Sequence, residues 1–347
     1  MVPGIWSRYF IAGVLSLLSL LVDGQYSAPF GKDAGDYPGS PGQPVYSIQW
    51  VGQYPAQKEK RERDRSTTWL TDLLFGKKPA DLVKPMSVVA MNPDTFWIAD
   101  QGSGSILRVF NQVGEMTQLK HEEVESLPSI VGSCFIPGNK TLFTDSRLNT
   151  VFWFEHGQKA LHILNDSLRL EQPTGIAYSA VNREIWVVET KAHRISVLDE
   201  NGEMIRHIGG RGNAPGMFNF PTYIWIDNSG TVYVVDAMNF RIQVLDKEGA
   251  FISDFGEIGD ASGYFSRPKG VATDSYGHIY IVDALFHVVQ VFDREGNYLY
   301  AFGSQGEGPE QFWMPTGIYI DKRNFIYIAD SYNSRVQIFE LTDTPRQ

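Results

Sequence analysis

The sequence predicts an all-β fold, a six-bladed β-propeller of four-stranded blades whose ring is closed by an N-terminal strand. A strand-rich motif recurs with a period near 47 residues, and segments 227–236, 274–283 and 321–330 are close copies of one another. A repeat of this length is typical of propellers and related arrays. Two markers count six copies. A proline opens each copy (Pro85, Pro128, Pro173, Pro221, Pro268 and Pro315), and an acid closes its second apolar run (Asp100, Asp145, Glu189, Asp236, Asp283 and Asp330).

Each copy predicts four strands. In the last copy, residues 315–320 form a short first strand, and residues 325–329 are apolar at nearly every position, which indicates a strand covered on both faces. Residues 335–339 alternate polar and apolar side chains, as a half-exposed third strand does. Residues 298–302 of the preceding copy predict a fourth strand that ends at Gly303, because glycine readily adopts the positive φ of a turn.

The sixth copy has no fourth strand of its own, since the repeat stops near Glu340. Residues 45–52 match the fourth-strand pattern of residues 250–256, including the terminal glycine. We therefore expect residues 45–52 to complete the sixth blade, which removes an open sheet edge. This organisation assigns the blades to residues 85–340 and leaves residues 341–347 as a tail.

Glycine-rich linkers lead into the first strands of the later copies, and an Asp-x-x-Asn-x-Arg element recurs at Asp236 and Asp330. These features resemble NHL repeats over about residues 45–340, most strongly after residue 205. The linkers that carry the resemblance are residues 209–222, 256–270 and 303–317. The resemblance implies a six-bladed β-propeller. It does not imply a reaction, because this scaffold hosts lactonases, lyases, nucleic-acid binders and interaction domains.

Composition excludes some partners and sites. The net charge is −10 with no long basic stretch, which argues against nucleic acid, whose binding needs clustered Lys and Arg. The single cysteine, Cys134, excludes an internal disulfide and disfavours a zinc thiolate site. Because Cys134 lies in the apolar segment 130–136, we expect it to pack in the core.

The N-terminus resembles a targeting segment. Arg8 precedes an apolar run over residues 10–22, which is too short for a comfortable membrane span and suits a signal peptide. We expect residues 1–24 to be removed near Gln25 and the mature chain to be extracytoplasmic, either secreted or periplasmic. An uncut segment would instead associate with a membrane. Residues 25–44, rich in Gly, Pro and Ser, predict a disordered lead-in.

Residues 53–84 form a charged insertion between the closing strand and the first blade. Within it, residues 68–76 predict a short helix with one apolar side, formed by Trp69, Leu70, Leu73 and Leu74. This helix either covers the propeller rim or docks on a partner or membrane surface.

Strand direction places the linkers between blades and the turns between second and third strands on one face, called the linker face below. Thr174, Thr222 and Thr316 are expected at the channel mouth on this face. His193 and His287 each lie four residues beyond a repeating acid, which suggests a specialised surface there. The candidate binding residues of this face are Tyr223, Arg267, Lys269, Trp313, Arg194, Arg241, His193, His287 and Arg335.

The repeating acids could form a metal ring, but we expect them to cap the following turns and to pair with an Arg five residues later. The glycine-rich linkers precede strands rather than helices, so they are not phosphate loops. No nucleophile elbow or His-Glu-x-x-His motif is present. We therefore expect a non-enzymatic module, without cofactor, metal or catalytic residues, that binds a protein or envelope complex. The alternative is a metal-dependent lactonase, lyase or hydrolase with a Ca or Zn ion in the central channel, which needs polar ligands from several blades.

Overall fold

The computed structural model describes residues 45–55, 82–110, 117–119, 124 and 127–344. The chain divides into two compact units, residues 1–31 and 32–347, and every described residue belongs to the second. The predicted signal peptide, the lead-in and the helix of the insertion lie outside the described residues.

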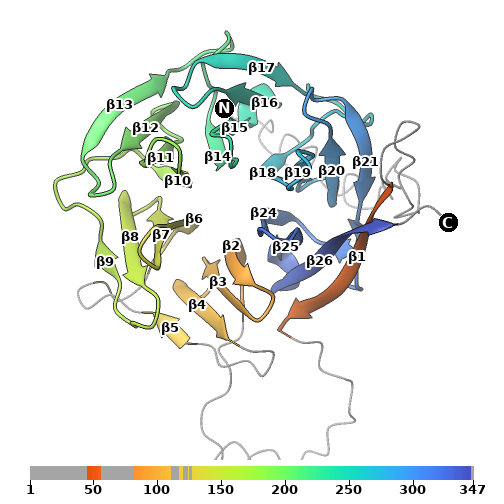
Figure 1. Cartoon of the computed structure of the whole chain (residues 1–347), viewed down its shortest axis with the longest axis horizontal. Helices are drawn as coiled ribbons and strands as arrows, with labels where there is room; N and C mark the ends of the chain where they lie inside the picture. Colours follow the sequence, from red (N-terminus) through yellow and green to blue (C-terminus); the bar gives the residue numbers. More distant parts are fainter. Residues whose placement is uncertain (1–44, 56–81, 111–116, 120–123, 125–126, 345–347) are drawn as a thin grey trace, which may run out of the picture. The chain divides into compact units, whose positions relative to one another are not determined.

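Six four-stranded sheets surround a central axis within the second unit (Figure 1). Blade 1 contains β2 (Pro85–Asn92), β3 (Thr95–Asp100), β4 (Ser105–Phe110) and β5 (Thr117–Leu119). Blade 2 contains β6 (Ile130–Ile136), β7 (Lys140–Asp145), β8 (Thr150–Glu155) and β9 (His162–Ile163). Blade 3 contains β10 (Pro173–Ser179), β11 (Glu184–Glu189), β12 (Arg194–Leu198) and β13 (Met204–Gly209).

Blade 4 contains β14 (Pro221–Ile226), β15 (Val232–Asp236), β16 (Arg241–Leu245) and β17 (Phe251–Phe255). Blade 5 contains β18 (Pro268–Thr273), β19 (Ile279–Asp283), β20 (Val288–Phe292) and β21 (Tyr298–Phe302). Blade 6 contains β24 (Pro315–Ile320), β25 (Phe325–Asp330), β26 (Arg335–Thr344) and β1 (Val45–Tyr54). The linker before blade 6 holds the short parallel pair β22 (Ser304–Gln305) and β23 (Gln311–Phe312).

The predicted closure is confirmed: β1 pairs antiparallel with β26 as the fourth strand of blade 6. The Trp50 indole Nε1 donates a hydrogen bond of 3.0 Å to the side-chain oxygen of Gln337 across this pair. The third strand is longer than the sequence predicts, because β26 continues to Thr344 and pairs there with the start of β1. The first and last strands of the repeat region therefore close the ring together and leave no tail before residue 344.

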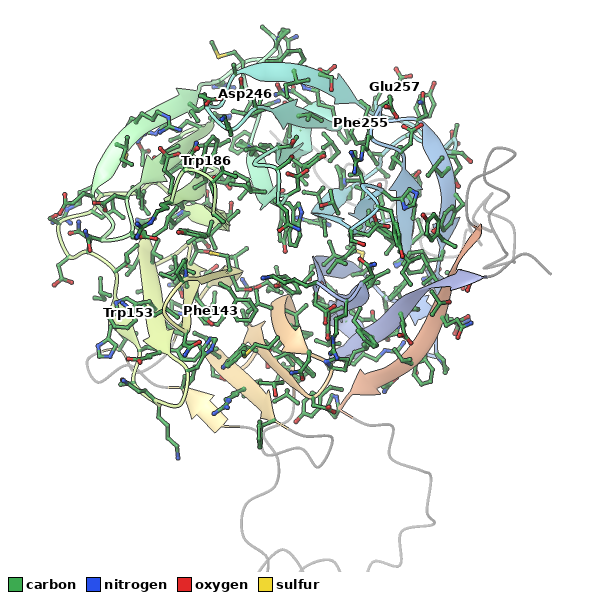
Figure 2. All side chains as sticks on the ribbon, in the orientation of Figure 1. Phe143, Trp153, Trp186, Asp246, Phe255 and Glu257 are labelled. Carbon is green, nitrogen blue, oxygen red and sulfur yellow. The ribbon has the colours of Figure 1, made fainter. Side chains whose placement is uncertain are left out.

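The core lies between neighbouring blades. All five residues of β15 and of β19 are buried, because a second strand is covered by a blade on each side. Trp186 of blade 3, for example, is fully buried in a cluster that includes Ile224 and Val234 of blade 4. Figure 2 labels Trp186 within the body of a blade and Glu257 at the outer edge of the ring.

One predicted marker of the repeat, Pro128, does not open the first strand of its blade. The first strand of blade 2 begins at Ile130, which pairs with Asp145 as Pro85 pairs with Asp100. Pro128 lies two residues earlier, so Ile130, not Pro128, is the equivalent of the other opening prolines. A buried apolar side chain satisfies this position, and the proline ring itself is not required.

Helical structure within the described residues is confined to the 3-10 turns η1 (Ala237–Asn239) and η2 (Ser331–Asn333). No helix in this part of the chain is both long and apolar enough to cross a membrane.

Candidate functional site

The repeating acids are structural, as the sequence predicts, and all six are fully buried. Asp236 accepts hydrogen bonds from the Asn219 N–H at 2.6 Å, the Arg241 Nε at 2.9 Å and the Gln243 Nε2 at 3.0 Å. One carboxylate thus ties the incoming linker to the turn between second and third strands. Among the described residues, no three His, Cys, Asp or Glu side chains are grouped so as to hold a metal ion.

The predicted ion pair with an arginine five residues after the acid forms in blades 3, 4 and 6. Blades 1, 2 and 5 instead have Ser105, Thr150 and Val288 at the position of the arginine. In blade 5, Phe286 and Val288 occupy the positions that hold Asn239 and Arg241 in blade 4, so Asp283 lacks these two side-chain donors. Its carboxylate instead accepts backbone hydrogen bonds, including one of 2.8 Å from Ser266 and one of 3.1 Å from Leu285. Burial without a cation raises the pKa of Asp283, and the backbone donors only partly oppose the rise.

The three predicted arginines at the strand starts are engaged internally. Arg335 is 4% exposed; its Nε lies 2.8 Å from Asp330 Oδ2, and its Nη atoms donate to the carbonyls of Glu307 and Gly308. Arg241 makes the equivalent contacts in blade 4 and also binds Asp254 at 2.6 Å. Arg194 pairs with Glu189 at 2.8 Å. Arg241 and Arg335 thus fasten linkers to their blades, Arg194 pairs within its own blade, and the three do not form a free basic patch.

The two predicted histidines have the same role. His193 and His287 have φ values of 55° and 59°, in the left-handed region, at the end of the turn between second and third strands. Their Nδ1 atoms accept backbone hydrogen bonds from Phe220 at 3.0 Å and Met314 at 3.1 Å, the residues just before the next opening prolines. Burial lowers the pKa of His287. Each histidine therefore holds the entry of the following blade, and the expected specialised surface is a repeated structural contact.

The other four predicted residues differ in exposure. Arg267 is exposed on the linker face, and Trp313 is 43% exposed with its ring 6.2 Å from that of Tyr332. Lys269 is half-buried, and burial together with the charges of Arg267 and Lys84 lowers its pKa to about 8. Tyr223 lies in the channel, where burial raises the pKa of its phenol. The structure therefore leaves two of the nine predicted residues, Arg267 and Trp313, open on the linker face.

Thr174 and Thr316 at the channel mouth each contact a second hydroxyl group, whereas Thr222 of blade 4 does not. Thr174 Oγ1 lies 2.7 Å from Thr190 Oγ1, and Thr316 Oγ1 lies 2.8 Å from Ser331 Oγ. Blade 4 has Ala237 at the position of Thr190 and Ser331, and the buried Thr222 hydroxyl has no hydrogen-bond partner in the structure. The loss of one hydroxyl in a repeated pair explains this orphan group.

Sequence reasoning missed a set of exposed side chains on the linker face. They lie two residues after the repeating acid, at the tip of the turn between second and third strands. Blades 4, 5 and 6 carry large apolar residues there: Met238 is 54% exposed, Leu285 49% and Tyr332 57%. Blades 1, 2 and 3 carry the exposed residues Gly102, Arg147 and Lys191 at the same position. Alignment of this one position across the six copies would have revealed the difference.

The structure also contains a cavity of about 810 Å³ that opens on the opposite face, among the turns between first and second strands. Of the nine predicted residues, only Tyr223 lines it. The repeating acids lie on the linker face, and the predicted site residues were chosen around them, so they do not include the residues of these turns.

Comparison with known proteins agrees with the fold. A family model described as a 6-bladed beta-propeller matches residues 165–255 and 265–346. No curated protein matches the sequence.

Three solved structures illustrate the range of similar proteins. An auxiliary nutrient binding protein from Bacteroides ovatus shares 16% identity, with a TM-score of 0.58 over 87% of this chain and 78% of that one. Virginiamycin B lyase from Staphylococcus aureus shares 14% identity, with a TM-score of 0.56 over 86% of this chain and 100% of the lyase. A chain of a nidogen/laminin complex shares 18% identity, with a TM-score of 0.51 over 63% of this chain and 80% of that one.

At these identities the likeness shows the fold alone, and binding and enzymatic roles are both compatible with it. The family match does not distinguish NHL repeats from other propeller repeats, so that finer resemblance stays a prediction. The matched segments and the ring of six four-stranded blades together support assignment of this chain to a six-bladed β-propeller family.

Proposed function

We propose that this protein is an extracytoplasmic binding module that takes a protein partner, free or within an envelope complex, on its linker face and catalyses no reaction. The observation that carries the proposal is the apolar set over blades 4–6, formed by Met238, Leu285 and Tyr332. Exposed apolar residues that cluster on one surface are typical of interaction sites. Trp313, beside Tyr332, adds the kind of aromatic side chain that anchors interfaces.

The contrast between blades supports the same proposal. The tip of the second-to-third-strand turn is exposed in every blade, so the structure does not require an apolar residue there. Blades 1–3 show that Gly, Arg and Lys are accepted at this position. The fold therefore does not require the three large apolar side chains that consecutive blades carry at this position. Arg267, exposed nearby, adds a cation suited to an acidic patch of the partner.

The test compares partner recovery by quantitative pull-down from native extract. One bait carries Met238→Ser, Leu285→Ser and Tyr332→Ser, and a second carries Trp313→Ala with Arg267→Ala. A control bait carries Met91→Ser and Val181→Ser, which are 51% and 47% exposed on the opposite face. We expect at least one protein whose recovery falls about tenfold or more with the first two baits and is unchanged with the control. Equal recovery of every co-purified protein from all baits would refute the proposal.

The alternative, a metal-dependent lactonase, lyase or hydrolase, predicts different results for the same purified protein. It predicts stoichiometric Ca or Zn by elemental analysis, together with turnover of lactone or ester substrates. Substrate turnover by the metal-supplemented protein would favour the enzyme, and absence of turnover would favour the binding module.

A further inference from the structure

The 810 Å³ cavity lies on the face opposite the proposed partner surface. It opens among the turns at residues 227–231, 274–278 and 321–324, called the turn face below, and extends along the central channel. Its volume falls within the range of about 300–1,000 Å³ that is usual for small-molecule sites. We propose that this cavity binds a neutral saccharide of one to three rings.

Tyr223 closes the inner end of the cavity. At its position in the first strand, blades 2, 3, 5 and 6 have glycine and blade 1 has Ser87. Those glycines are needed because the first strands approach closely: a Cβ on Gly270 would lie 2.7 Å from the Thr316 carbonyl oxygen. The hydroxyl of Tyr223 donates to the carbonyl of Ile318 at 3.0 Å, and Ile318 belongs to blade 6. The Tyr223 ring therefore spans the channel from blade 4 and separates the cavity from the linker-face mouth.

The wall of the cavity carries aromatic rings that the repeat does not require. Trp225 and Tyr319 stand where blades 1, 3 and 5 carry Val89, Ala177 and Ala272. The Trp225 and Tyr319 rings meet edge to face at 5.6 Å, and Phe135 meets Tyr319 at 6.0 Å. The Trp225 Nε1 donates to Thr273 Oγ1 at 2.9 Å, which fixes the orientation of the indole. The cavity thus has a preformed aromatic wall in its interior.

The rim of the cavity is polar, and hydrogen bonds within and between its turns fix their conformation. The Asp227 carboxylate accepts N–H bonds from Ser229 at 2.8 Å and Thr231 at 2.9 Å, so it serves its own turn. The Asn324 side-chain oxygen accepts the Ser275 N–H at 2.9 Å and joins the turns of blades 5 and 6. The other polar side chains at the mouth are mainly hydroxyls, from Ser229, Thr231, Ser253 and Ser275, together with the amide of Asn228 and the cations Arg294 and Lys322.

This combination matches a sugar. A pyranose ring has one face of C–H groups, which stacks on an aromatic ring, and an edge of hydroxyls, which bonds to hydroxyl and amide groups. The lining also contains three carboxylates, Asp227, Asp274 and Asp321, against the two cations Arg294 and Lys322. Because these charges nearly balance, the cavity favours a neutral ligand over a strongly charged one.

Saturation-transfer difference NMR on the full chain tests the proposal with maltotriose, cellotriose and N,N′,N″-triacetylchitotriose as neutral probes, and with indole-3-acetate as a charged aromatic comparison. We expect saturation transfer to the ring protons of at least one trisaccharide. The signal should fall at least fivefold in Trp225→Ala and persist in Trp153→Ala, a half-buried tryptophan of blade 2 outside the cavity. Asn228→Trp, an exposed substitution at the rim that leaves the core intact, should also abolish the signal.

Three outcomes would overturn the proposal: no transfer to any trisaccharide at millimolar concentration, transfer to indole-3-acetate alone, or transfer that Trp225→Ala and Asn228→Trp both leave unchanged. The result is independent of the pull-down, because Met238, Leu285 and Tyr332 lie on the other face.

Discussion

Two buried aspartates at equivalent positions should differ in their sensitivity to the same substitution. Asp330 accepts hydrogen bonds from Asn333 at 2.8 Å and Arg335 at 2.8 Å on its Oδ2 atom, whereas Asp283 accepts only backbone N–H groups. Asp330→Asn places an amide N–H group against these donors and leaves Arg335, 4% exposed, without its anion. Removal of one partner of a buried pair costs about 3–5 kcal/mol.

Asp283→Asn should cost less. The Asn oxygen keeps the hydrogen bonds that Leu285 and Phe286 donate to Oδ1, and the main loss is the bond from Ser266 to Oδ2. One unsatisfied buried donor costs about 1–3 kcal/mol. Against this cost, the substitution removes a buried charge that no cation neutralises. We therefore expect Asp283→Asn to destabilise by about 1 kcal/mol and Asp330→Asn by about 4 kcal/mol.

Urea unfolding followed by tryptophan fluorescence measures the difference, from midpoint shifts at constant slope. The pH dependence is a second readout. Since the folded state raises the pKa of Asp283, ionisation destabilises wild type as pH rises through that pKa, and the cost of Asp283→Asn should shrink over the same range.

A variant of blade 5 with the missing side-chain donors provides a control for the comparison of Asp283→Asn with Asp330→Asn. Phe286→Asn with Val288→Arg restores in blade 5 the residues that surround Asp236 in blade 4. In that background, Asp283→Asn should become about as costly as Asp330→Asn. If Asp283→Asn in the wild-type chain proves as destabilising as Asp330→Asn, the assignment of the difference to the missing guanidinium is refuted.

The remaining predictions concern stability and processing. Ala237→Ser should stabilise by about 1 kcal/mol, because it supplies a partner to the buried Thr222 hydroxyl; an unchanged or lower urea midpoint would contradict this. Lys269→Met should raise the free energy of unfolding by up to about 3 kcal/mol at pH 7, because the folded state lowers the pKa of Lys269 to about 8. This gain should shrink as pH rises from 8 to 10.5, and thermal unfolding scans across that range measure the change. Deletion of residues 25–52 removes all but the last two residues of β1, and should lower the thermal midpoint or cause association through the exposed edge of β26; an equally stable monomer would argue against closure. Mass spectrometry of the native protein should find a chain that starts near Gln25, and a cytoplasmic full-length chain would disprove export.

The number of blades and the closure of the ring could be derived from the sequence because both depend on local patterns. The acid after each second strand and the alternation within each strand recur in every copy, so a few residues of context suffice to recognise them. The equivalence of residues 45–52 with residues 250–256 was visible for the same reason. The prediction that Pro128 opens blade 2 was wrong, because the pairing of Ile130 with Asp145 defines the start of that strand. Pairing between two strands cannot be read from one segment alone.

The candidate site depended on contacts between blades that no single repeat displays. His193, Arg241 and Arg335 were expected at a surface, but each bonds to a linker about 25 residues away in sequence. The sequence by itself therefore determined the ring and the role of the repeating acids, since these arise within one copy. The tertiary structure decided which side chains stay exposed and where Tyr223 and Trp225 point, because the channel and its cavity exist only once six blades enclose them.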